Sequence, residues 1–183
     1  MPKKQSLLHT PKFDVELWKV ALSDGREVDR QVVVHPGAVT ILAIGEDGSI
    51  VMIRNRRFAA DQVLFELPAG TLEADEDPKE CAHRELIEET GYRAQTIEPL
   101  IEFYTSPGIC TERMYAYVAR GLTHVGQDLD DSEEIDVEIV AADKIRQDLI
   151  EGKLLDGKTI AVLGTYFAIE DAKRDQRAAG VSD

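Results

Sequence analysis

One segment near the middle of the chain specifies both ends of a helix. Asp77 is a favourable N-cap, Pro78 suits the first helical position, and Glu80 completes a capping box with the aspartate. Gly91 can adopt the left-handed conformation that ends a helix. The sequence therefore predicts a helix over 78–90, and its position limits how the flanking segments can pack.

This helix carries three glutamates close together. Glu85, Glu88 and Glu89 fall within an arc of about 100° around the helix axis, and like charges four residues apart repel unless something compensates them. A solvated acidic helix face is one interpretation. The rigid turn at 67–70, directly before a well-capped helix, favours another, in which the carboxylates form a site. Clustered oxygen ligands suit a hard cation such as Mg²⁺ or Mn²⁺.

The residues from Gly70 to Tyr92 resemble the signature segment of the Nudix hydrolase superfamily. They match the pattern GX5EX7REUXEEXGU, in which U is a bulky hydrophobic residue, at every fixed position. Tyr92 stands where an aliphatic residue is more common. The resemblance implies a metal-dependent enzyme that hydrolyses the diphosphate bond of a nucleoside diphosphate linked to another group.

The resemblance also implies a role for individual residues. Arg84 would orient the catalytic glutamates through salt bridges, and Glu76 would support the loop against Arg84. Glu89 would act in catalysis as well as in metal binding. The implied metal ligands are the backbone carbonyl of Ala69 and the side chains of Glu85, Glu88 and Glu89.

Periodicity and turn signals outline the rest of the fold as α/β or α+β with a mixed sheet. Strands are predicted at 13–22, 27–34, 38–44, 49–54, 63–67, 96–104, 113–120 and 134–140, and further helices at 142–151 and 158–176. The resemblance implies a Nudix α/β/α sandwich over 37–183, preceded by an N-terminal extension of antiparallel strands over 1–36.

In the sugar-nucleotide branch of the family, such an extension pairs across a homodimer and contributes to the partner's substrate pocket. The resemblance therefore implies a homodimer in which Trp18 and Phe13 are interface or base-stacking residues. Ordinary core packing would explain either aromatic residue by itself.

Downstream residues resemble the ADP-ribose pyrophosphatases within this family. Pro107 follows Gly91 by 16 residues, which is the proline mark of that group, and Glu112 falls where the group carries a catalytic glutamate. A loop carboxylate that pairs with Arg113 or with solvent is the alternative for Glu112. The acidic run 128–138 resembles a second variable loop, so the base could instead be one of two further residues, Glu133 and Glu134.

A basic cluster precedes the turn at 67–70. The ADP-ribose group often reads Arg-Gln-aromatic-Arg where this chain has Arg54, Asn55, Arg56 and Arg57. Arg57 can clamp a diphosphate, and Arg54 is a second substrate-binding candidate, while a solvated strand end is the alternative. Because Asn55 and Arg56 replace the glutamine and the aromatic residue, a broader nucleoside diphosphate sugar hydrolase is expected, with GDP-mannose hydrolases resembled as well.

The charge balance restricts the class of partner. Lys and Arg total 21 against 35 Asp and Glu, a formal net charge of -14, which disfavours nucleic acid and anionic membrane surfaces as partners. Neither a secretory signal nor a membrane-length apolar run is present, and a cytoplasmic protein is expected.

A non-catalytic Nudix module that senses a nucleotide sugar is an alternative, although such modules generally lose box glutamates. Enzymes for dinucleoside polyphosphates or capped RNA share the same box.

Overall fold

The computed structural model describes residues 3–129 and 134–180. Its largest sheet follows the order β12-β5-β4-β10-β9. The strands are β4 (Ala38–Ile44), β5 (Ile50–Arg57), β9 (Thr96–Tyr104), β10 (Arg113–Arg120) and β12 (Ile135–Val140), with the shorter β6 (Gln62–Glu66) paired to β5 and β7 (Ala69–Thr71) paired to β4. β4 and β10 are parallel and the other pairs antiparallel. The mixed sheet expected from the sequence is confirmed.

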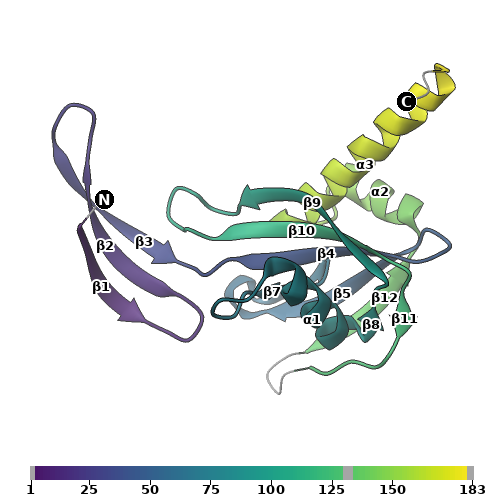
Figure 1. The fold of residues 1–183 in the computed structure, drawn as a ribbon, viewed down its shortest axis with the longest axis horizontal. Coiled ribbons are helices and arrows are strands. Elements are labelled where there is room, and N and C mark those ends of the chain that lie inside the picture. The colour runs from purple at the N-terminus through teal and green to yellow at the C-terminus, as the bar shows by residue number, and fades with distance from the viewer. Residues whose placement is uncertain (1–2, 130–133, 181–183) are drawn as a thin grey trace.

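Helices cover both faces of this sheet (Figure 1). They are α1 (Pro78–Thr90), α2 (Ala142–Ile150) and α3 (Gly157–Ala178). In β4, Val39 and Ile41 pack with α1, whereas Leu42 and Ile44 pack with α2 and α3. A strand covered on both faces is apolar throughout rather than alternating, which explains its uninterrupted run of buried residues. The α/β/α sandwich is confirmed.

The first three strands form a separate antiparallel sheet. They are β1 (Lys3–His9), β2 (Asp14–Ala21) and β3 (Glu27–Val34). This sheet projects from the body of the molecule, on the side away from the C-terminal end of α3 (Figure 1). None of residues 3–36 is buried in the described chain. The division into an extension of 1–36 and a domain of 37–183 stays a prediction.

Differences from the expected elements concern short or polar segments. β1 is not predicted by the sequence, because its exposed, lysine-rich segment lacks apolar alternation. β5 continues to Arg57, beyond the expected 49–54, because its polar end pairs with β6. β7 forms within the expected turn by pairing with β4. The remaining short elements are a 3-10 helix (Phe58–Ala60), β8 (Tyr92–Arg93) and β11 (Thr123–His124).

Within the described ranges, no helix combines the length and the apolar character needed to cross a bilayer. Both cysteines are free thiols, Cys81 buried and Cys110 half-buried. The expected cytoplasmic location stays a prediction.

Candidate active site

Helix α1 begins and ends as the sequence predicts. The Asp77 carboxylate accepts hydrogen bonds from two backbone N–H groups of the first turn, at 2.9 and 3.4 Å, and Gly91 ends the helix with a φ of 72°. This placement buries Glu85 and Glu89, which are 8% and 3% exposed. The face that carries them is therefore not simply a solvated acidic one.

Arg84 joins three carboxylates through one guanidinium. Its Nε and Nη2 donate to the two oxygens of Glu76 at 2.9 and 3.0 Å, and its Nη1 donates to Glu85 Oε1 and Glu88 Oε2, both at 2.8 Å. The hydrogen bonds to Glu76, with the charge of Glu85, raise the pKa of Arg84. This geometry agrees with an orienting role for Arg84, and that role stays a prediction.

Glu76 makes stability depend on pH through the same contact. The hydrogen bonds from Arg84 lower the pKa of Glu76 from 4.5 to about 2. Because the folded-state pKa is depressed, the stabilisation is complete above about pH 4.5 and is lost as the pH falls toward about 2. We expect Glu76→Gln to lower the free energy of unfolding at neutral pH by about 1 to 3 kcal/mol, measured by urea denaturation.

The difference between wild type and this variant should shrink as the pH is lowered through 4. Glu98→Gln is the matched control, since Glu98 is exposed on β9. A difference between wild type and Glu76→Gln that stays constant with pH would contradict the assignment.

Gly70 lies so close to Glu85 that no side chain fits there while the Glu85 carboxylate keeps its position. A Cβ at Gly70 would lie 1.8 Å from Cδ and 1.9 Å from Oε1 of Glu85. The preceding residue, Ala69, donates its backbone N–H to Glu89 Oε2 at 2.8 Å. The loop before the helix and the helix itself are therefore fitted to each other around two carboxylates.

A cavity of about 260 Å³ lies where this loop meets α1, and Glu85, Glu88 and Glu89 line it. In the part of the chain that the structure describes, no three carboxylate, imidazole or thiol groups are close enough together to hold a metal ion as they stand. Arg84 Nη1 donates to one oxygen of Glu85 and to one oxygen of Glu88. The donors are carboxylate oxygens, and Gly70 leaves the approach to Glu85 free of a side chain, so the set fits a hard cation in its chemistry.

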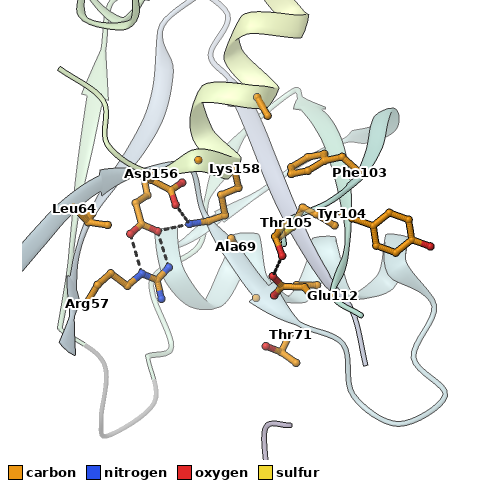
Figure 2. A pocket seen from close by; sticks show the side chains of 16 residues that line it. Arg57, Leu64, Ala69, Thr71, Phe103, Tyr104, Thr105, Glu112, Asp156 and Lys158 are labelled. Atoms are coloured by element: carbon orange, nitrogen blue, oxygen red, sulfur yellow. Dashed lines mark hydrogen bonds and ion pairs between the residues drawn. The ribbon is translucent and has the colours of Figure 1, made fainter. Parts of the chain in front are cut away.

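A larger cavity of about 630 Å³ adjoins this acidic cavity. Both are lined by Arg57 and by the three residues of β7, so the two cavities adjoin along that strand. In the larger cavity, Arg57 and Lys158 lie on one side, and Thr105 and Glu112 lie on the other (Figure 2). Its volume is typical of a small-molecule site.

Arg57 lies where the two cavities meet. Its Nε and Nη2 donate to the carboxylate of Glu66 at 2.8 and 2.6 Å. These hydrogen bonds are the main cause of a raised pKa for Arg57, with further contributions from the charges of Glu89 and Asp156. Its side chain is 39% exposed, so part of the guanidinium remains accessible from the cavities.

Glu112 lies in the larger cavity. The Thr105 hydroxyl donates to its Oε2, and His35 Nδ1 lies 3.7 Å from its Oε1. Arg113, the alternative partner considered for Glu112, forms its ion pair with Glu102 instead. The carboxylate thus lies at the wall of the larger cavity, and its role as the base stays a prediction.

The loop that carries Glu112 is anchored to the end of β3. The Val33 N–H donates to the Ile109 carbonyl at 2.8 Å, and the Val33 carbonyl accepts from the Thr111 N–H at 2.9 Å. The His35 N–H donates to Thr111 Oγ1 at 2.9 Å. The extension is therefore joined directly to the loop of the candidate base.

Three other candidates lie outside the residues that line the two cavities. Arg54 pairs with Glu138 on the surface, Pro107 is exposed in the β9–β10 loop, and Trp18 is half-buried in β2 with the Lys4 ammonium 4.3 Å from its ring centroid. Their contacts with a substrate stay predictions, and so does the interface role of Trp18.

The alternative bases are only partly described. Glu134 is exposed and directly precedes β12. Glu133 lies outside the described residues. A catalytic role for either glutamate stays a prediction.

Several polar residues that the structure brings to the site had no role assigned from the sequence, among them Glu66, Lys158, Lys12 and His35. Glu66 and Lys158 line the larger cavity, Lys12 from the β1–β2 turn lines the acidic one, and His35 contacts the Glu112 loop. Only Glu66 carried a usable signal, because it stands directly before the turn at 67–70. The other three reach the site through tertiary contacts.

Comparison with known proteins agrees with this arrangement. The model of the NUDIX domain matches residues 34–162. The chain belongs to the NUDIX family. A solved structure described as an ADP compounds hydrolase has the same fold, with a TM-score of 0.77 over 99% of this chain and 97% of that one, at 20% sequence identity.

Several relatives resemble this NUDIX-family chain over most of its length. The methanol dehydrogenase activator of Bacillus methanolicus is 39% identical, over 84% of this chain and 83% of its own. The ADP-ribose pyrophosphatase of Bacillus subtilis is 33% identical over 95% of both chains. The GDP-mannose pyrophosphatase of Cronobacter sakazakii is 35% identical, over 69% of this chain and 71% of its own.

Proposed function

We propose that this NUDIX protein hydrolyses the diphosphate bond of nucleoside diphosphate sugars such as ADP-ribose and GDP-mannose. The water oxygen bonds to one phosphorus, the bridging P–O bond breaks, and the products are a nucleoside monophosphate and a sugar phosphate. The observation that carries the proposal is that the two cavities share Arg57 and β7 in their walls, while the box glutamates line the acidic cavity and Glu112 lines the larger one. The names of the pyrophosphatase relatives support the same substrate class.

The box residues would hold Mg²⁺, or Mn²⁺, through Glu85, Glu88, Glu89 and the Ala69 carbonyl. A bound divalent cation neutralises phosphate charge and lowers the pKa of an attacking water. Arg84 keeps Glu85 and Glu88 at the cavity through its hydrogen bonds. Arg57 binds the diphosphate as a planar donor.

Glu112 is proposed as the general base, because its carboxylate lines the larger cavity and is fixed by the Thr105 hydroxyl. Glu112→Gln should lower kcat by about 10²- to 10⁴-fold, as expected when a general base is removed, with the thermal midpoint retained. Steady-state kinetics measure this effect, and Glu134→Gln is the comparison variant. A loss below about fivefold for Glu112→Gln, with a large loss for Glu134→Gln, would move the role to the 133–134 loop.

Substrate choice is tested by kinetics on ADP-ribose, GDP-mannose, UDP-glucose, diadenosine polyphosphates and capped RNA, assayed side by side with Mg²⁺. The proposal predicts that kcat/KM is highest for a nucleotide sugar. Capped RNA or a dinucleoside polyphosphate as the best substrate would contradict the proposed class.

A second candidate is a sensor module that binds a nucleotide sugar and acts on a partner protein. The relative named methanol dehydrogenase activator favours it, and the intact set of box glutamates argues against it. Binding of a nucleotide sugar without turnover in the same assays would support the sensor.

We also propose a homodimer formed through the N-terminal sheet. No helix covers this sheet in Figure 1, and Leu7 and Leu8 on β1 are 49% and 52% exposed. A second copy would bury such apolar side chains. Light scattering after size exclusion should give twice the mass of 20.3 kDa, and a monomer at micromolar concentration would contradict this assembly.

A further inference from the structure

Glu66 is a buried carboxylate at the wall of the larger cavity. It is the last residue of β6 and has no exposed surface. Its two oxygens accept hydrogen bonds from Arg57 Nε at 2.8 Å and Arg57 Nη2 at 2.6 Å, and Oε2 also pairs with Lys158 Nζ at 2.5 Å. The dashed lines that end at the labelled Arg57 and Lys158 in Figure 2 include these contacts. One carboxylate therefore organises two cations from different elements.

Burial of the carboxylate makes these contacts obligatory. An ionised group without water is stable in a protein only when it is paired and hydrogen-bonded. The two cations exceed the charge of Glu66 by one, and Asp156 Oδ1 lies 3.0 Å from Lys158 Nζ. The four side chains are therefore neutral together, and because Lys158 shares Oε2, Arg57 is not the only partner of the carboxylate.

The hydrogen bonds with Glu66 fix which edge of the Arg57 guanidinium can face a substrate. Glu66 faces the Nε and Nη2 edge of the planar guanidinium, so the donors on Nη1 point away from it. Arg57 lines both cavities. An anion that extends from the large cavity toward the box glutamates would meet this edge.

The first turn of α3 holds the same arrangement in place. Asp156 Oδ2 accepts from the Thr159 N–H at 2.9 Å and from the Thr159 hydroxyl at 2.6 Å, and that hydroxyl oxygen accepts from the Leu67 N–H at 2.8 Å. The turn that carries Lys158 is therefore bonded to the residue that follows Glu66. This link fixes both ends of the Lys158–Glu66 pair.

We infer that Glu66 is the positioning residue that sets the orientation of Arg57 toward the diphosphate of the substrate, with Lys158 sharing its charge. The inference rests on the proposed hydrolysis of nucleoside diphosphate sugars. It assigns a task in substrate binding to a side chain that has no exposed surface of its own.

The test compares Glu66→Gln, Arg57→Lys and the double variant. Without the Glu66 carboxylate, the Arg57 guanidinium is no longer held in one orientation. Glu66→Gln should therefore raise KM for ADP-ribose by about 10- to 100-fold and change kcat by less than about threefold. If Glu66 acts through Arg57, the double variant should be no worse than Arg57→Lys alone. Glu66→Asp, which keeps the charge, should recover part of the loss.

Glu102→Gln is the matched control, because Glu102 also pairs with an arginine, Arg113, but on the exposed surface of β9 and β10. It should leave KM unchanged. Should Glu66→Gln fail to fold by circular dichroism, Lys158→Met replaces it and should raise KM, with Lys153→Met on the exposed surface as its control. An unchanged KM in the folded variant, or additive effects in the double variant, overturns the inference.

A wild-type protein without turnover would refute the proposed function and not this inference. In that case calorimetry with inorganic pyrophosphate gives the readout. Wild-type binding that is weakened at least about tenfold by Glu66→Gln supports a positioning role, whereas equal binding, or none to the wild type, overturns it.

Discussion

Glu89→Gln is expected to lower kcat by at least about a hundredfold while the fold is retained. Glu89 is 3% exposed, and its Oε2 accepts the Ala69 N–H at 2.8 Å. The oxygen of a glutamine can accept the same hydrogen bond, so the loop before the helix should stay in place. The negative charge next to Arg57 and the acidic cavity is lost, and with it the anionic ligand for a divalent cation.

The measurement is steady-state hydrolysis of ADP-ribose by the purified variant, together with its thermal midpoint. Glu80→Gln is the control, because it replaces the same side chain in the same way at an exposed position of the same helix. Full activity of a folded Glu89→Gln protein would refute the metal site.

Gly70→Ala is expected to have an equally large effect on activity for a steric reason. The new methyl group would lie 1.8 Å from Cδ of Glu85, far inside van der Waals contact. Because the obstructing atoms are the end of a flexible side chain, the chain can still fold by turning the Glu85 carboxylate away. That movement breaks the 2.8 Å hydrogen bond from Arg84 and removes Glu85 from the acidic cavity.

We therefore expect kcat/KM to fall by at least about a hundredfold, with a loss of only a few degrees in the thermal midpoint, or about 1 kcal/mol. Gly164→Ala in α3 is the control, since nothing lies within 4 Å of its added Cβ and alanine favours a helix. Wild-type activity in Gly70→Ala would show that the position of Glu85 is not required.

Local rules were sufficient for the elements that define the core. The helix at 78–90 and the strand at 38–44 have the predicted bounds, because capping residues and a continuous apolar run act over a few positions. The strand at 3–9 was not predicted, since an exposed edge strand needs no apolar alternation. Three box glutamates, Glu85, Glu88 and Glu89, also line the acidic cavity.

Contacts between distant segments could not be predicted in this way. Glu66 and Lys158 are 92 positions apart and meet only after α3 packs against the sheet. His35 donates its N–H to Thr111, which lies 76 positions downstream in the Glu112 loop. This contact forms because Val33 at the end of β3 makes an isolated β-bridge with Cys110 in the same loop. Such contacts depend on how the strands and helices are connected in space. The residues that flank Glu66, Lys158 or His35 in the sequence form no pattern that indicates the distant partner.

Hydrolysis of a nucleotide-sugar diphosphate at the two adjoining cavities should require a divalent cation. Phosphorus NMR of ADP-ribose incubated with the purified protein measures this directly. With Mg²⁺, the diphosphate resonances should be replaced by the two phosphomonoester resonances of AMP and ribose 5-phosphate, and excess EDTA should prevent the change. Diphosphate resonances that persist with Mg²⁺, or that disappear equally fast with EDTA, would contradict the account.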